Sequence, residues 1–175
     1  MNFDVLSAER YSVRKFEQVP VEPEKLSLIL EAARNAPTAS NKQPQRILVV
    51  TRQEGLEKVD RCTRCRFGAP LVLIVCYDKN ECWVRKFDGE KSGLVDASIV
   101  TAQMMLQAAD IGLGSTWVMH FDPAAAREAF KLPENLVPAA MLIVGRPAPD
   151  AAPAEFHRIR HSLEKLVYFE EFSKP

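Results

Sequence analysis

Residues 92–114 read SGLVDASIVTAQMMLQAADIGLG, and this stretch decides the fold of the chain. Apolar residues recur there at helical spacing, and Gly112 suits a C-terminal cap, so the pattern predicts the longest helix of the protein. Its apolar face combines small and flexible side chains: Leu94, Ala97, Thr101, Met104, Met105, Ala108 and Ala109. A helix that is apolar over most of its circumference is either a core helix or part of a subunit interface.

Runs of apolar residues on both sides of this helix predict a sheet. The four predicted strands are RILVVT (46–51), LVLIVCY (71–77), STWVMHF (115–121) and AAMLIVG (139–145). Three shorter helices are predicted in PEKLSLILEAARNAP (23–37), QEGLEKVDR (53–61) and DPAAAREAFKL (122–132). The sequence therefore predicts an α+β fold in which helices cover a central sheet, and we expect one domain over residues 1–175.

Charge and composition exclude several classes of protein. The 175 residues include 23 basic and 23 acidic side chains, whereas a nucleic-acid-binding surface needs an excess of positive charge. No apolar run approaches the ~18 residues of a membrane span, and the N-terminal sequence lacks the apolar core of a signal peptide. We therefore expect a cytoplasmic protein that binds neither nucleic acid nor a membrane.

Two patterns raise the question of a metal. Cys62 and Cys65 form a CxxC pair, and His157 and His161 form an HxxxH pair. Structural zinc sites usually place their two halves about 12–20 residues apart, whereas most of the chain lies between these two pairs. The CxxC pair precedes a predicted strand, whereas a thioredoxin-type dithiol opens a helix. We expect reduced thiols and no metal site.

Four polar segments could be either functional or merely structural. They are RYSVRKF (10–16), APTASNKQP (36–44), GLGSTWVMHFD (112–122) and RIR (158–160). Exposed arginines are usually surface charge, prolines can frame a rigid connector, and a tryptophan usually belongs to the core. Alternatively, the arginine side chains could bind a phosphate bidentately, and the asparagine and glutamine amides could face the edge of a heterocycle.

In this order and at these intervals, the segments resemble the nitroreductase family of FMN-dependent oxidoreductases. The resemblance includes APLVLIVCYD (69–78) and AAMLIVGRP (139–147), and it covers nearly the whole chain. It implies a three-layer α+β sandwich with a mostly antiparallel central sheet. It also implies a homodimer with FMN at the subunit interface. The extended C-terminal segment would pack on the partner subunit through Val167, Tyr168, Phe169 and Phe172.

The resemblance also assigns the cofactor site. The phosphate and ribityl end of FMN would contact Arg10, Tyr11, Ser12, Arg158 and Arg160. Arg14 would lie near N1 and O2 of the ring, whereas Lys15 would stay in solvent. The other chain of the dimer would supply Pro37, Thr38, Ser40, Asn41 and Gln43. The reactive face of the ring would lie by Trp117, Val118, Met119 and His120, with His120 structural or solvent-facing rather than a general acid or base.

The implied reaction needs no catalytic side chain, because flavin N5 carries the chemistry. NADH or NADPH would deliver a hydride, and a nitroaromatic, a quinone or a similar electron-poor acceptor would then take the electrons in a ping-pong cycle. The Arg14 guanidinium would stabilise the negative charge that reduction places on the ring. Two alternatives stay open: a flavin-binding redox-sensing or storage dimer, and a specialised enzyme that fragments flavin or removes halogen.

The sequence departs from the family pattern in two places. Some relatives carry a ring-binding lysine near residues 61–67, and here Arg64 or Arg66 could replace it. Residues 78–91 are the expected lid or acceptor-contact segment, in which Trp83 and Phe87 could cover the ring or close the core. The sequence decides neither the physiological acceptor nor the choice between NADH and NADPH.

Overall fold

The computed structural model describes residues 2–172, so residue 1 and residues 173–175 of the predicted domain lie outside the described part. That the chain forms one domain stays a prediction. The elements follow one another as α1 (Phe3–Glu9), α2 (Pro23–Asn35), the 3-10 turn η1 (Ala39–Asn41), β1 (Gln45–Val50), α3 (Gln53–Cys62), β2 (Leu71–Asp78), α4 (Gly93–Asp110), β3 (Gly114–Val118), α5 (Pro123–Ala129), β4 (Leu136–Gly145), the 3-10 turn η2 (Glu155–Arg158) and α6 (Leu163–Leu166).

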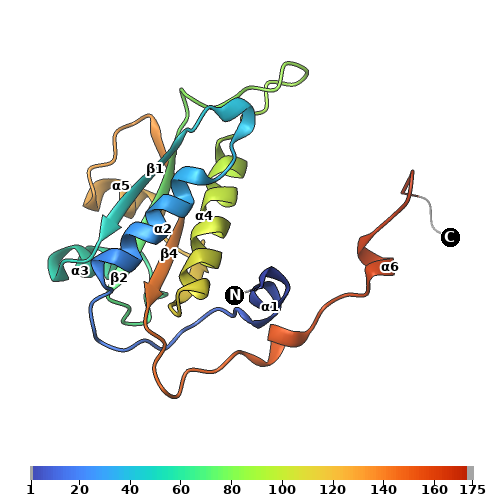
Figure 1. Cartoon of the computed structure of the whole chain (residues 1–175). Coiled ribbons are helices and arrows are strands. Elements are labelled where there is room, and N and C mark those ends of the chain that lie inside the picture. The colour runs from blue at the N-terminus through green and yellow to red at the C-terminus, as the bar shows by residue number, and fades with distance from the viewer. Residues whose placement is uncertain (1, 173–175) are drawn as a thin grey trace.

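The four strands form one antiparallel sheet in the order β1-β2-β4-β3 (Figure 1). β2 and β4 occupy its centre, where Ile74 pairs with Met141 and Leu73 with Leu142. Both strands are near-continuous apolar runs, as strands buried on two faces must be. The predictions of a central strand at 71–77 and of a mostly antiparallel sheet are confirmed.

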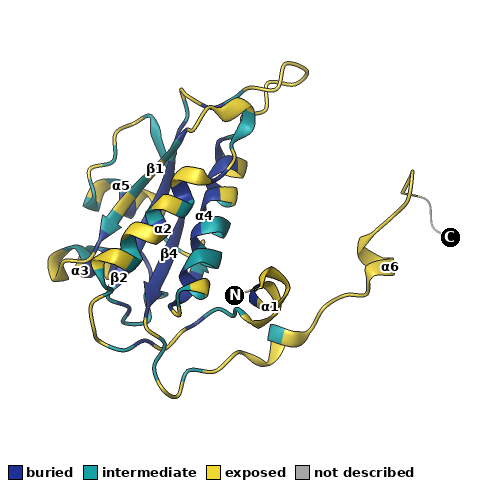
Figure 2. Ribbon diagram, viewed as in Figure 1, coloured by how far each residue is buried: buried dark blue, intermediate teal, exposed yellow. Residues whose placement is uncertain are grey.

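Helices cover both faces of this sheet, which gives three layers (Figures 1 and 2). Successive side chains of a strand point to opposite faces. Val72 and Ile74 therefore pack with α3 and α5, whereas Leu71, Leu73 and Val75 pack with α2 and α4. All five side chains are fully buried. The predicted three-layer α+β sandwich is confirmed.

α4 is the longest helix, as its sequence predicts, but its buried face is narrower than the apolar pattern suggests. Ala97, Met104 and Ala108 are fully buried against the sheet. Leu94, which the sequence assigned to the same face, is 49% exposed, and the neighbouring Val95 is 61% exposed. The first turns of α4 therefore present apolar side chains that this chain does not cover.

Some boundaries differ from the prediction for local reasons. The third strand ends at Val118 rather than Phe121, because the Phe121 N–H turns back to the Met119 carbonyl at 3.0 Å. Asp122 then caps α5 by accepting bonds from two backbone N–H groups, as its position predicts. The short helices α1 and α6 were not predicted, because seven and four residues carry too little periodicity.

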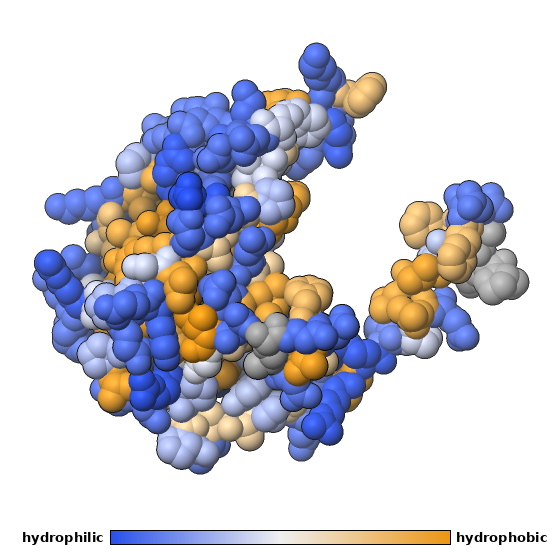
Figure 3. All heavy atoms as spheres, in the orientation of Figure 1, coloured by the Kyte–Doolittle hydropathy of each residue, from blue (hydrophilic) through white to orange (hydrophobic). Residues whose placement is uncertain are grey.

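The segment from Pro147 onward leaves the three layers and extends away from them (Figures 1 and 2). We call residues 147–172 the C-terminal arm. Phe169 and Phe172 on this arm are 83% and 91% exposed. Apolar side chains gather on its outer part, apart from the body of the molecule (Figure 3). Whether the arm packs on a partner subunit stays a prediction.

Candidate functional site

The structure brings the first and last predicted basic segments together. The Tyr11 hydroxyl donates to the Ala151 carbonyl at 3.3 Å, and the Tyr11 and His157 rings meet edge to face at 6.1 Å between centroids. Tyr11, Arg158 and Arg160 line one hollow, together with residues of α1. Arg10 lies half-buried beside it, on an apolar cavity that Tyr11 also lines. Segments about 150 positions apart in the sequence therefore form one basic surface.

The arginines of this surface have no carboxylate partner within residues 2–172. Arg14 donates to the Ser12 carbonyl at 3.3 Å, and Arg160 donates to the Ile159 carbonyl at 2.8 Å. Lys15 differs, because it pairs with Asp150 at 2.6 Å, but its side chain is exposed, so the prediction that it stays in solvent is confirmed. This ion pair is well exposed to solvent, so it contributes little to the free energy of folding. Arg10, Arg158 and Arg160 therefore present positive charge to these two hollows, which Glu9 also lines, whereas Arg14 lines neither of them.

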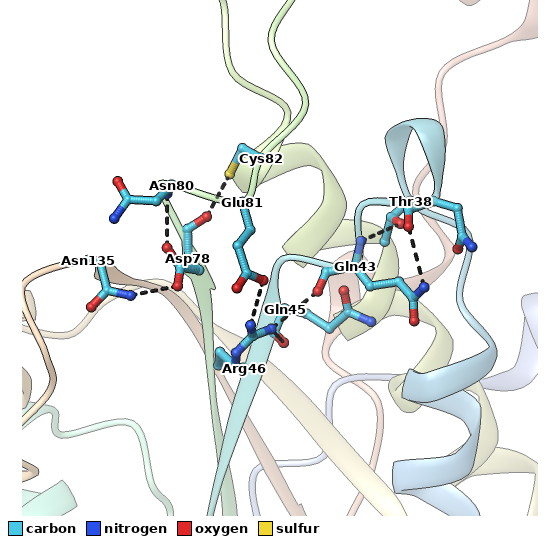
Figure 4. A network of polar contacts seen from close by, with 10 residues as sticks. Thr38, Gln43, Gln45, Arg46, Asp78, Asn80, Glu81, Cys82 and Asn135 are labelled. Carbon is cyan, nitrogen blue, oxygen red and sulfur yellow. Dashed lines mark hydrogen bonds and ion pairs between the residues drawn. The ribbon is translucent and has the colours of Figure 1, made fainter.

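Residues 37–43 form a tightly bonded loop between α2 and β1. The Gln43 N–H donates to the Thr38 hydroxyl at 3.0 Å (Figure 4). The Asn41 N–H donates to the Thr38 carbonyl at 2.9 Å. Ser40, Asn41 and Gln43 have φ values of 49°, 51° and 50°. Non-glycine residues rarely adopt this left-handed conformation, and such strain often accompanies binding sites.

The same loop is anchored to the sheet. Arg46 donates to the Gln43 carbonyl at 3.2 Å and pairs with Glu81 at 2.5 Å (Figure 4). The Asp78 N–H donates to the Pro44 carbonyl at 2.8 Å. Side chains that the sequence assigns to the cofactor, those of Pro37, Ser40, Asn41 and Gln43, are nevertheless exposed. The loop is therefore a preformed shape that exposes these side chains, although the Gln43 Nε2 donates to the Asn41 carbonyl at 3.3 Å.

One chain does not bring this loop and the basic surface together. The loop lies at the N-terminal end of α4, where the Ala39 N–H reaches Asp96 at 2.9 Å. Arg10 and Tyr11 lie at the other end of the helix, in a cavity lined by Met105 and Ala109. Thirteen residues of α-helix separate Asp96 from Ala109, which is about 20 Å.

The predicted ring-facing residues leave the end of β3 and pack on the CxxC segment. The Thr63 hydroxyl donates to the His120 carbonyl at 2.6 Å, and the Asp122 N–H donates to the Cys62 carbonyl at 2.9 Å. Val118 is buried, whereas Met119 is 64% exposed and His120 is exposed. The buried Trp117 Nε1 has no hydrogen-bond partner within the described chain. A buried N–H without a partner is unusual and needs an explanation.

Arg64 and Arg66 are not equivalent replacements for a ring-binding lysine. Arg66 is held by both carboxylate oxygens of Asp60, at 2.6 and 2.7 Å, and by the Ala69 carbonyl. It is therefore committed to the fold, and its proposed role was wrong. Arg64 is exposed and lines a polar hollow with His120, so it alone remains a candidate.

Cys62 of the CxxC pair has the environment of a structural thiol, whereas Cys65 is only partly buried. Cys62 is buried, and its Sγ donates to the Lys58 carbonyl at 3.2 Å. Burial, and secondarily the charge of Asp122, raises the pKa of the Cys62 thiol, which makes the reactive thiolate less accessible. Among residues 2–172, no group of three or more His, Cys, Asp or Glu side chains is placed to hold a metal ion.

The expected lid segment is a small hairpin that projects beyond the sheet. Val84 and Lys91 form a bridge, and Arg85 pairs with Asp88 at 2.6 Å near the tip. Phe87 at the tip is 98% exposed, so it does not close the core of this chain, whereas Trp83 is half-buried.

Comparison with known proteins identifies the family. The model of the Nitroreductase family matches residues 8–67 and 64–146. This chain belongs to the nitroreductase family. A nitroreductase family protein of Clostridium difficile 630 is 42% identical in sequence and superposes with a TM-score of 0.92 over 98% of this chain and 99% of that one.

Two further relatives of this nitroreductase-family protein carry more specific names. A Methanothermobacter thermautotrophicus protein, provisionally named NADH dehydrogenase/NAD(P)H nitroreductase, is 31% identical over 93% of this chain and 87% of its own length. The FMN-dependent nitroreductase of Clostridium difficile R20291 is 27% identical, with a TM-score of 0.79 over 97% of this chain and all of that one. No helix among residues 2–172 has the length and hydropathy needed to cross a membrane.

Asp96 of this nitroreductase-family protein was not predicted from the sequence as part of the site. Its side chain is 1% exposed and joins the 37–43 loop to α4. The available signal was an acidic residue in the first turn of an otherwise apolar helix, which is also a common surface feature.

Proposed function

We propose that this chain is an FMN-dependent oxidoreductase that takes a hydride from NADH or NADPH and reduces nitroaromatics, quinones or similar electron-poor acceptors in a ping-pong cycle. The names of two relatives support the cofactor and the donor, because one is called FMN-dependent and the other an NAD(P)H nitroreductase. The cytoplasmic location remains a prediction from composition.

The basic surface between the two ends of the chain carries this proposal. A phosphate monoester bears nearly two negative charges, and arginine forks match its oxygens bidentately. Arg10, Arg158 and Arg160 lie around Tyr11 without carboxylate partners in the described chain. These residues fit the phosphate end of FMN, with Ser12 beside them.

We further propose that the complete site needs two copies of the chain. The basic surface and the 37–43 loop lie at opposite ends of α4, so a second copy must supply the missing half of each site. Exposed apolar side chains on α4 (Leu94 and Val95) and on the arm (Phe169 and Phe172) provide the surface for such a homodimer. Burying them would remove the apolar area that a single chain leaves in water.

The remaining residues have distinct tasks in this site. FMN, when bound, would supply the hydride-transfer chemistry, and the residues of this chain would hold and orient it. The Arg14 guanidinium stabilises negative charge at the N1–O2 edge of the ring. The Trp117 to His120 segment would lie against the reactive face of the ring and offer a backbone N–H to N5. No side chain is needed as a general acid or base.

The redox-sensor alternative loses support, because the pKa of Cys62 is raised rather than lowered. Flavin fragmentation and dehalogenation would use the same cofactor site with a different substrate. Steady-state oxidation of NADH or NADPH in the presence of a quinone distinguishes these alternatives from the proposed reaction. The proposed reaction predicts a turnover rate that depends on the quinone concentration.

The visible spectrum of the purified protein is the first experiment, and we expect a flavin spectrum or its recovery on adding FMN. Arg10→Ala or Arg160→Ala should then weaken FMN binding about tenfold or more, since each removes a charge-assisted phosphate contact. Lys15→Ala is the matched control, because Lys15 already pairs with Asp150. A colourless protein that FMN does not reconstitute refutes the proposal. Unchanged affinity in both arginine variants would place the phosphate elsewhere.

A further inference from the structure

Asp96 is a buried carboxylate that the proposed reaction does not use. It lies in the first turn of α4 and is 1% exposed. One carboxylate oxygen accepts the Ala39 N–H at 2.9 Å, and the other accepts the Ser92 hydroxyl at 2.6 Å. Burial of a charge is costly unless hydrogen bonds compensate, and the positive end of the α4 dipole adds further stabilisation.

No lysine or arginine pairs with this carboxylate within the described chain. The Asp96 charge acts on the nearby Cys82 thiol instead. Burial makes the largest contribution to raising the pKa of that thiol, and the charge of Asp96 raises it further. Gly93 is packed so closely against Tyr77 and Cys82 that a Cβ there would overlap both side chains. The carboxylate therefore sits in a crowded corner, where its function is to accept hydrogen bonds.

The loop that Asp96 holds is one that needs an external anchor. Ser40, Asn41 and Gln43 all have left-handed backbone conformations, and such strain persists only where surrounding contacts enforce it. In each hydrogen bond inside the loop, the acceptor is an oxygen of Thr38, Ala39 or Asn41. The Ala39 N–H bond to Asp96 connects this bonded unit directly to α4.

We propose that Asp96 is the positioning residue of the 37–43 loop, holding it in the shape that faces the flavin of the second chain. It acts through the loop backbone and touches neither cofactor nor substrate. Ser92 orients the carboxylate by donating to its second oxygen. The Ser92 N–H also donates to the Trp83 carbonyl at 3.0 Å, so the same corner fixes the base of the 84–91 hairpin. The functional part of this proposal rests on the proposed FMN site.

The test compares Asp96→Ala with Asp96→Asn. The amide of Asn retains an oxygen for the Ala39 N–H and gains an N–H for the Ser92 oxygen. Two quantities are measured: the FMN dissociation constant of the apoprotein, and backbone hydrogen exchange in residues 37–44. Asp96→Ala should raise the dissociation constant about tenfold or more and speed exchange in this segment, whereas Asp96→Asn should stay within about threefold of the wild type.

Thr101→Val is the matched control, because it removes a buried bond from the Thr101 hydroxyl to the Ala97 carbonyl in the same helix. It should lower the melting temperature without changing FMN affinity or loop exchange. If Asp96→Ala lowers the melting temperature but leaves both loop quantities unchanged, the residue is only structural and the proposal is overturned. An Asn variant as impaired as Ala would also overturn it, by showing that charge rather than hydrogen bonding matters.

The hydrogen-exchange measurement separates this proposal from the proposed function. If the wild type does not bind FMN, the proposed function fails, and loop exchange in the apoproteins still decides whether Asp96 positions the loop. Should Asp96→Ala not fold, Ser92→Ala provides the second variant. It leaves the Ala39 bond but frees the carboxylate, and a smaller change in the same direction is expected. No change in loop exchange for Ser92→Ala would then overturn the proposal.

Discussion

The three-layer body and the C-terminal arm differ in how far their large apolar side chains are buried. In the body, Leu71, Leu73 and Ile74 on the central strand are fully buried by helices of the same chain. On the arm, Phe169 and Phe172 are almost fully exposed, although the Phe172 ring contacts that of Tyr168 at 5.1 Å between centroids. The outer part of the arm is exposed along its length (Figure 2). The body buries most of its large apolar side chains, with Leu94 and Val95 on α4 as exceptions, whereas the outer part of the arm exposes them.

Charged groups show only a partial contrast. Basic residues on the body, such as Arg46 and Arg66, pair with carboxylates of the same chain. Arg158 and Arg160, near the start of the arm, have no carboxylate partner within residues 2–172. Arg10 and Arg14, outside the arm, also lack a carboxylate partner among the described residues, so it is the exposed aromatic side chains that distinguish the arm from the body.

The largest expected effect comes from removing the arm from residue 154 onward. The body should keep its fold, because its core contains no residue beyond that point. The proposed dimer should dissociate, and FMN binding should weaken at least about a hundredfold, since two phosphate-binding arginines are lost. Light scattering, circular dichroism and FMN titration measure these three properties. A truncated protein that stays dimeric would show that the arm does not form the interface.

Within the body, the largest loss of stability should come from a substitution that leaves a cavity in the core. Leu73→Ala removes a fully buried side chain from the layer between the sheet and helices α2 and α4, which should cost about 2–5 kcal/mol in the free energy of unfolding. Leu166→Ala on the arm is the matched control, because Leu166 is 60% exposed. Urea denaturation at low protein concentration should show little change for this control. Equal decreases in the free energy of unfolding for the two variants would contradict the difference between body and arm.

A smaller effect concerns alkaline pH. Burial in the body raises the pKa of the Cys76 thiol to about 11 from an ordinary value of 9.0. Between these values the unfolded chain loses this proton and the folded chain keeps it. The stabilisation, at most about 3 kcal/mol, is therefore complete below pH 9 and is lost as pH rises through about 11.

Unfolding free energies of the wild type and of Cys76→Val, followed from pH 8 to pH 11, test this point. The free energy of unfolding of the wild type should fall more steeply with pH, because only the wild type contains the buried Cys76 thiol. Parallel curves would show that Cys76 does not titrate differently in the two states.

The main elements were predictable because their signals are local. The apolar runs of β2 and β4 predict buried strands, and the spacing of apolar residues predicts α4. The role of Arg66 was not predictable, because its partner Asp60 lies on the neighbouring helix and depends on the turn between them. The pairing of Lys15 with Asp150 likewise joins two distant segments.

By itself, the sequence determined the layers, the antiparallel sheet and the resemblance to the nitroreductase family, because periodicity and ordered motifs are properties of short segments. Only the tertiary structure decided how those segments meet. It placed Arg158 beside Tyr11, set the 37–43 loop at the opposite end of α4, and buried Asp96 under that loop. The physical reason is that hydrogen bonds and burial depend on distances between residues far apart in the chain, which no local pattern encodes.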